Sequence, residues 1–188
     1  MKYLFSCLFS IPFMVFSQEE PQDSLSDFSI TIDGGYLLGG QISGNDFLYH
    51  SGLSGRLIGS KKLTQNFTLG IGAGIDQYDE FSFTSALLRV TYNQNTHTPG
   101  SFMAYAGYSF SNEGNSGGVL FQEFEEGLTL EVGRLWIYNI SPKLDFTSSL
   151  TFRHQFSEIE LESPSGTILR EKVDFDSINL RIGINVKL

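Results

Sequence analysis

The 188-residue sequence is poor in charged residues, in proline and in cysteine. Charged residues make up 18% of the chain, below the roughly 25% that is usual for soluble globular proteins. Only 12 residues are Lys or Arg against 21 Asp or Glu, which argues against nucleic acid as a partner, because phosphate binding needs clustered cations. The single cysteine, Cys7, lies in the N-terminal segment. The rest of the chain therefore has no disulfide and no cysteine-based metal site.

The N-terminal segment 1–17 has a Lys at position 2, an almost unbroken apolar run, and small residues at the positions of a cleavage site. This pattern is typical of a secretory signal peptide, and it is too short for a membrane-spanning helix. We expect cleavage after residue 17, a short tail over 18–26 and a single domain over 27–188.

Aromatic residues and glycine are abundant, with 17 Phe, 8 Tyr, 1 Trp and 20 Gly. No later stretch reaches the ~18 consecutive apolar residues of a membrane helix, and apolar and polar residues alternate with a period of two instead. Eight segments show this alternation: 27–37, 50–60, 66–76, 81–92, 101–111, 126–138, 143–156 and 175–188. Short connections alternate with mostly longer ones, of which the long ones are 38–49, 111–125 and 157–174. The pattern predicts an all-β, up-and-down antiparallel barrel of eight strands.

The alternation does not by itself say which face of each strand points into the barrel. A soluble barrel turns its apolar faces inward and binds a hydrophobic ligand, whereas a membrane barrel turns them toward lipid. The polar faces here consist mostly of Ser, Thr, Gly and Asn, which suits a crowded interior better than a water-exposed surface. Gly70, Gly72 and Gly74 share one face and would leave room for long side chains. We therefore expect a transmembrane barrel, with a secreted soluble barrel as the less favoured alternative.

The alternating segments and the terminal strand SINLRIGINVKL resemble the small outer membrane β-barrel proteins of Gram-negative bacteria. The segment LLRVTYNQNTHTPGSFMAYAGYSF resembles the fourth and fifth strands of the barrels common in Bacteroidetes. The resemblance covers about 27–188 and implies a monomer in the outer membrane, surrounded by lipid and lipopolysaccharide and inserted by the outer membrane insertion machinery. Both termini would be periplasmic, and no cofactor is implied. The chain ends in Leu188, whereas many of these barrels end in Phe.

Aromatic residues near the strand ends predict two girdles at the membrane interfaces. Those near the short turns are Tyr92, Phe102, Trp136 and Tyr138. Those near the longer loops are Tyr36, Tyr78, Phe81, Phe110, Phe152 and Phe175.

The charged residues on the polar faces predict an interior network. They are Asp33, Arg56, Asp76, Arg89, Glu131, Asp145, Arg153 and Arg181. An Arg that faces lipid near the midplane would cost ~2–4 kcal/mol, so we expect these groups to pair inside the barrel. A packed core would suit a non-enzymatic structural or surface-interaction protein, whereas exchanging partners would suit a narrow channel for small solutes. Arg134 falls on the apolar face, and either it snorkels beside Trp136 or a bulge at Gly133 reverses the faces.

Catalysis and metal binding have little support. Some outer membrane barrels are lipid A deacylases with a His-x-Ser arrangement, but here His154 is followed by Ser157 and Glu158. Positions three apart on a strand lie on opposite faces, so we expect no enzyme. We expect His50 and His97 to be solvated, and no His pair has metal-ligand spacing. The acidic long connections predict a solvated rim, cation bridging to lipopolysaccharide, or a surface for a protein partner.

Overall fold

The structure is a computed structural model that describes residues 27–44, 46–78, 81–93, 100–112, 122–124, 126–162 and 168–188. The segments expected to be a signal peptide and a tail, 1–17 and 18–26, lie outside the described residues, so both stay predictions. No helix formed by the described residues is long and apolar enough to cross a membrane.

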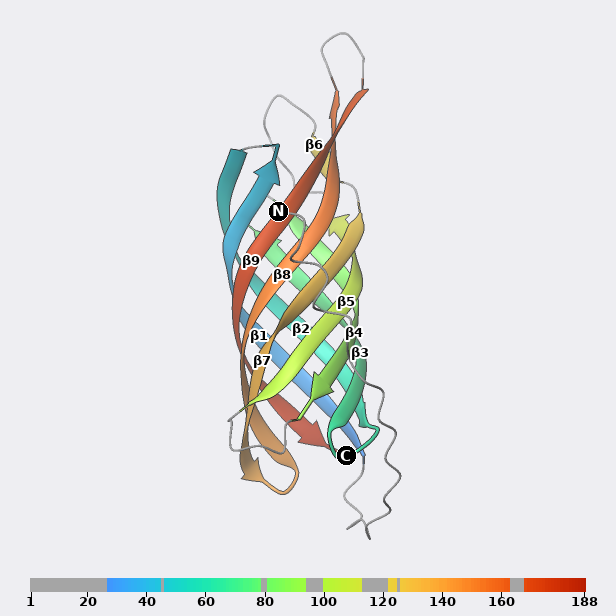
Figure 1. Ribbon diagram of the computed structural model, residues 1–188, viewed down its shortest axis with the longest axis vertical. Helices are drawn as coiled ribbons and strands as arrows, with labels where there is room; N and C mark the ends of the chain where they lie inside the picture. The colour runs from blue at the N-terminus through green and yellow to red at the C-terminus, as the bar shows by residue number, and fades with distance from the viewer. Residues whose placement is uncertain are drawn as a thin grey trace, which may run out of the picture.

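The described residues form nine strands, of which eight are long. The strands are β1 (Phe28–Ser43), β2 (Asp46–Lys62), β3 (Phe67–Tyr78), β4 (Ser82–Tyr92), β5 (Ser101–Asn112), β6 (Gln122–Phe124), β7 (Gly127–Ser141), β8 (Leu144–Glu162) and β9 (Ile168–Lys187). Each long strand pairs antiparallel with the next along the chain, and β9 pairs with β1, which closes the barrel (Figure 1). The predicted eight-stranded up-and-down barrel is confirmed. β1 begins and β9 ends at one end, which we call the terminal end, and the opposite end is the loop end.

Two of the three predicted long loops are mostly strand, so their expected bounds were wrong. β1 and β2 meet at a tight turn at Gly44, whose φ of 59° favours glycine, within the predicted loop 38–49. β8 and β9 similarly extend into the predicted loop 157–174. Gly, Ser, Asn and Asp in these segments resemble loop composition, but strands that project past a bilayer have no need for a regular apolar face. The third loop holds β6, which pairs with β8.

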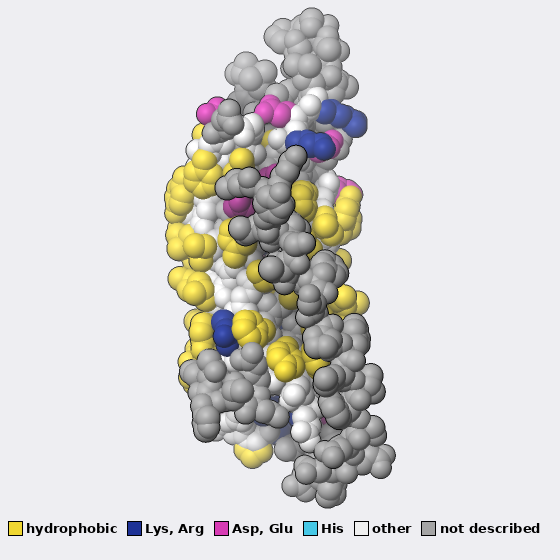
Figure 2. All heavy atoms as spheres, viewed as in Figure 1, with side chains coloured by type: hydrophobic (Ala, Val, Ile, Leu, Met, Phe, Trp, Pro, Cys, Tyr) yellow, Lys and Arg dark blue, Asp and Glu magenta, His cyan; other side chains and the backbone are white. Residues whose placement is uncertain are grey.

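The two faces of the barrel differ in polarity in the direction expected of a membrane protein. Large apolar side chains point outward, and Ile71, for example, is 73% exposed. Figure 2 shows hydrophobic side chains along the flank of the barrel, with most of the charged side chains in view gathered toward the loop end. Ser, Thr, Asn and Arg side chains are buried inside. The soluble alternative, which needs apolar faces inside, is therefore wrong.

Glycine makes room in the lumen for larger side chains from the facing strands. A Cβ added to Gly74 would lie 3.2 Å from Cγ of Arg56 and 3.3 Å from Cδ1 of Leu87. One added to Gly72 would lie 2.6 Å from Cδ1 of Ile58. The interior is thus packed to side-chain contact at β3, as an eight-stranded barrel requires.

Candidate functional site in the barrel lumen

A carboxylate from β7 lies at the centre of the lumen and is the best-satisfied charge there. Glu131 accepts six hydrogen bonds from four side chains. Nη2 of Arg56 donates to Oε2 at 2.5 Å, and Nη1 of Arg181 donates to Oε1 at 2.5 Å. Thr151 donates at 2.6 Å and Asn179 at 3.3 Å. Because the Glu131 side chain is only 2% exposed, these bonds replace its hydration almost completely.

A second ion pair joins β8 to β3. Nη1 of Arg153 donates to Oδ2 of Asp76, and Nη2 of the same guanidinium donates to Gln155. Its Nε donates to Thr129 at 2.9 Å. All three donor nitrogens of this buried arginine are therefore used, which fixes the orientation of the guanidinium plane.

Arg89 lies in the same region but pairs with hydroxyls instead of a carboxylate. Its Nη2 donates to Oγ of Ser60 at 2.6 Å and to Oγ1 of Thr31 at 3.2 Å. Nε of Arg89 has no hydrogen-bond partner among the described residues. Asp33 lies 3.9 Å from Nε of Arg181, and its Oδ1 likewise has no hydrogen bond within the part of the chain described. Nε of Arg56 and Oδ1 of Asp76 also lack a hydrogen-bond partner among the described residues, so four members of the predicted network each keep one unsatisfied atom.

Asp145 belongs to a different cluster, nearer the terminal end. It accepts from Nζ of Lys187 at 2.8 Å and from Nδ2 of Asn185 at 3.1 Å. Thr31 donates to Oδ1 of Asn185 at 3.0 Å and also accepts from Arg89, so a chain of hydrogen bonds links this cluster to Arg89. The sequence interpretation missed Lys187, because its place at the end of the last strand gave no sign of a partner.

We call the group of Glu131, Arg56, Arg181, Arg153 and Asp76 the charged layer, and an aromatic layer follows it toward the loop end. The aromatic layer consists of Leu37, Tyr78, Phe81, Phe83, Val173 and Phe175, all at most 5% exposed. Its rings are in contact, with centroids 4.8 Å apart for Tyr78 and Phe81 and 5.5 Å apart for Phe83 and Phe175. Toward the terminal end lies a lower apolar cluster, in which Tyr105 is stacked 4.5 Å below the guanidinium of Arg56.

The aromatic layer corrects part of the predicted girdle. Tyr78, Phe81 and Phe175 point into the lumen and not toward lipid. Tyr78 lies two residues past Asp76 on the same face of β3, so the alternation itself placed it inside. The lumen is charged near Glu131 and apolar toward the loop end. The expectation that aromatic residues near the strand ends face lipid is therefore wrong for the rings of this apolar part.

The other predicted girdle residues lie on the outward faces of their strands. Toward the loop end these are Tyr36, Phe110 and Phe152, and toward the terminal end they are Tyr92, Phe102, Trp136 and Tyr138. Phe67 also belongs to the second set, with its ring centroid 4.8 Å from that of Tyr92.

Arg134 lies on the outward face beside this second set. The inward and outward positions of β7 alternate without interruption through Gly133, and the only register shift falls between Asn139 and Ser141. The bulge hypothesis is therefore wrong. The guanidinium lies 3.9 Å over the ring of Phe102, and Nη1 donates to the carbonyl of Gly100 at 3.5 Å, which is the geometry of snorkelling toward the terminal end.

His154 and Asp176 form an outward-facing pair toward the loop end, with Nδ1 and Oδ1 2.6 Å apart. Ser157 is buried inside, on the opposite face of β8, so it cannot act as a nucleophile for this histidine. Within the described part of the chain, no three His, Cys, Asp or Glu are grouped so that they could hold a metal ion. His154, Asp176 and Ser157 therefore do not form a catalytic triad.

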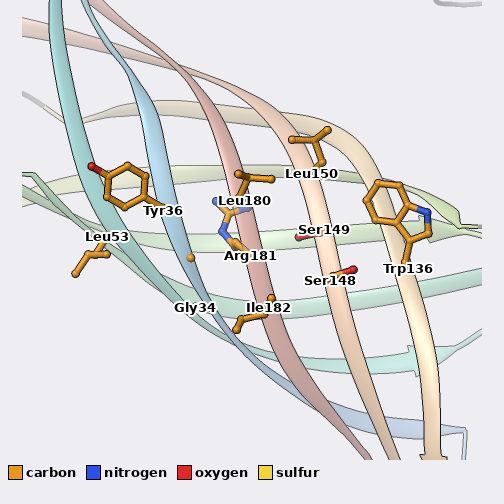
Figure 3. Close-up of a pocket in the computed structure, with 11 residues that line it drawn as sticks. Gly34, Tyr36, Leu53, Trp136, Ser148, Ser149, Leu150, Leu180, Arg181 and Ile182 are labelled. Carbon is orange, nitrogen blue, oxygen red and sulfur yellow. The ribbon is translucent and has the colours of Figure 1, made fainter.

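A shallow depression of about 640 Å³ lies on the outward face of the barrel across β2, β1, β9, β8 and β7. Figure 3 shows Tyr36 and Leu53 at one end and Trp136 at the other, with Leu180, Leu150 and Ile182 between them. It forms because small residues such as Gly34 and Ser148 do not fill the space between their larger neighbours. It therefore opens toward lipid and provides no passage along the lumen.

These features define a membrane β-barrel whose lumen is filled by side chains, and comparison with solved structures gives the same class. The crystal structure of Neisserial surface protein A matches with a TM-score of 0.59 and 16% identity, over 87% of this chain and 98% of that one. The structure of the outer membrane protein AlkL in lipid bilayers matches with a TM-score of 0.55 and 11% identity, over 93% and 98%. No family model and no curated protein matches the chain. The fold is thus that of the small outer membrane β-barrels.

Proposed function

We propose that this chain is a non-enzymatic outer membrane protein with a structural or surface-interaction role, and that its lumen does not conduct. The observation that carries this proposal is the filling of the lumen by two successive layers. In the charged layer Glu131 is held by four side chains, and in the aromatic layer the rings are in mutual contact. Opening a channel would require both layers to rearrange together.

Planar-bilayer recordings from the purified full-length chain test the closed lumen. We expect no stable conductance, because ions would have to displace paired charges that are almost fully desolvated. A double variant, Phe83→Ala with Phe175→Ala, is the matched control, since it thins the aromatic layer and leaves the charged layer intact. A stable, large conductance from the unaltered protein would establish the alternative, a narrow channel for small solutes.

We also propose that the terminal end faces the periplasm and the loop end faces outward. The strand pairs that extend furthest, β1 with β2 and β8 with β9, project at the loop end, as expected for the exposed side of such barrels. Asp46→Cys and Lys143→Cys place thiols at the two ends, both on exposed residues. An impermeant maleimide should label the first in intact cells and the second only after the outer membrane is opened. The reverse pattern would contradict this orientation.

A further inference from the structure

One strand of the barrel continues past its neighbour at the loop end. β2 pairs with β1 along its whole length, from Asp46, but its pairing with β3 begins only at Gly52 opposite Tyr78. The segment 46–51, which we call the β2 tip, is therefore paired with β1 on one side, and on the side toward β3 the described residues provide no strand partner for it. Figure 1 shows the β1–β2 hairpin projecting at this end.

The register defines which backbone groups face the β3 side. Near the terminal end, N–H of Lys62 donates to Asp27 on the β1 side, whereas N–H of Leu63 donates to Phe67 on the β3 side. The pairing of β1 with β2 is uninterrupted, so the alternation continues to the tip. N–H and C=O of Phe47 and Tyr49 thus point to the β3 side, where the described residues supply no backbone partner for them.

Three consecutive side chains of the β2 tip are apolar, although the tip lies past the girdle residue Tyr36, which is opposite Leu53. Phe47, Leu48 and Tyr49 are 56%, 55% and 61% exposed. Tyr49 lies four residues past Leu53, which is about 13 Å along the strand toward the loop end. Exposed apolar edges are the ones that other strands recognise.

β9 offers an internal contrast, because it also continues past its neighbour. Its pairing with β1 ends at Val173 opposite Ser43, and the part of β9 beyond that point carries Arg170, Glu171 and Lys172. Charged side chains at a projecting edge are the usual protection against pairing with another chain. The β2 tip has a charged residue only at its start, Asp46, and its next three residues are apolar.

We propose that the β2 tip binds an extended, basic segment of a partner protein by β-strand addition. This inference rests on the proposed surface-interaction role. The partner strand would bond to the backbone of Phe47 and Tyr49, and its apolar side chains would pack on the two rings. The basic character follows from the charge around the tip. Asp46 is part of the tip, and Asp174 and Asp176 lie on the outward face of β9, one strand beyond β1 and level in register with Phe47 and Tyr49.

A second copy of this chain fits the edge less well. Two barrels in one membrane are related by an axis along the membrane normal, so their β2 tips would run in the same direction. Parallel pairing is the less stable arrangement, and short segments gain little from it. A flexible segment from another protein can instead approach in the antiparallel direction.

Fluorescence anisotropy with the full-length protein in lipid nanodiscs tests the proposal. The probe is a short labelled peptide in which valine and threonine alternate and lysines occupy the ends. Two matched peptides carry glutamate in place of lysine, or N-methyl groups that remove the edge hydrogen bonds. We expect saturable binding of the lysine peptide and a loss of about tenfold or more for each matched peptide.

The key variant is Tyr49→Pro, because the lost N–H points away from β1 and the hairpin keeps its ladder. We expect it to weaken lysine-peptide binding by about tenfold, while Tyr49→Thr, which keeps the N–H, weakens binding less. Heat-modifiable gel mobility verifies that each variant is folded. If Tyr49→Pro does not fold, the N-methyl peptide still tests the edge hydrogen bonds, because it removes the donors of the peptide and leaves the protein unaltered.

Three outcomes would overturn the inference: equal binding of the lysine and glutamate peptides, equal binding by the unaltered protein and Tyr49→Pro, or no binding of the lysine peptide. A dimer that Tyr49→Pro dissolves would also overturn it, in favour of a second copy. If the lysine peptide does not bind and the lumen does not conduct, this inference is wrong and the proposed function is not contradicted. A conducting lumen removes the proposed function, whether or not the peptide binds.

Discussion

The charged layer around Glu131 and the aromatic layer around Phe83 fill neighbouring stretches of the same lumen by different means. Each charge in the first is held by directional bonds to named partners, such as Arg56 and Arg181 on Glu131. The rings of the second are held by contact alone, with centroids 4.8–6.3 Å apart. The charged layer therefore depends on the identity of its residues, whereas the aromatic layer depends on their volume.

The largest effect is expected from Glu131→Ala, which leaves two buried guanidinium groups without their carboxylate. We expect it to lower the free energy of unfolding by about 5 kcal/mol. Urea titration in lipid vesicles, followed by the gel-mobility difference between folded and unfolded forms, measures this change. Replacing Arg56, Glu131 and Arg181 together by Met, Leu and Met should cost less than the single change. A single change that costs under about 1 kcal/mol would contradict the ranking of the layers.

A smaller effect is expected in the aromatic layer. Phe83→Ala should lower the free energy of unfolding by about 3 kcal/mol through the cavity that it leaves. Phe83→Leu keeps most of the volume and should cost about 1 kcal/mol. The same urea titration compares these two variants with the conservative Arg153→Lys, which loses hydrogen bonds that lysine cannot replace. The comparison fails if Arg153→Lys is tolerated better than Phe83→Leu.

The smallest effect is expected at Arg89, the arginine bound by hydroxyls. Arg89→Met should change the free energy of unfolding by about 1 kcal/mol or less, because no carboxylate loses its direct partner. Arg153→Met is the matched control, since it leaves Asp76 unpaired, and it should cost about 3 kcal/mol or more. Equal losses for the two variants in the urea titration would show that burial and not pairing decides the cost.

Most of the fold follows from the alternation of apolar and polar residues. A period of two predicts strands, and small polar residues opposite apolar ones predict which face is inside, as at Gly72 and Gly74. The loop-end extensions of β1, β2, β8 and β9 were missed because exposed strands need no apolar face. Their loop-like composition then dominated the interpretation.

The lumen was harder to predict than the strands. The pattern assigns Glu131, Asp145 and Arg181 to the inside, but it does not give their heights along the barrel. Those heights follow from the stagger between strands, which brings Glu131 to Arg181 and leaves Asp145 with Lys187. The same limit applies to Tyr78. Counting two residues from Asp76 shows that Tyr78 points inward, but the sequence does not show that an apolar layer surrounds it there.

The partners of Glu131 have a consequence for the time course of folding. They lie 75, 20, 48 and 50 positions from it along the chain, and Arg181 also donates to Ser54, 127 positions away. An unclosed sheet that lacks β9 would lack three of the six hydrogen bonds to this carboxylate, so its charge would be only partly compensated inside the bilayer. Such distant contacts form slowly, since the intervening chain must be ordered first. We therefore expect the seam between β1 and β9 to close in a single late step, in which the last strand inserts and the charges are neutralised together.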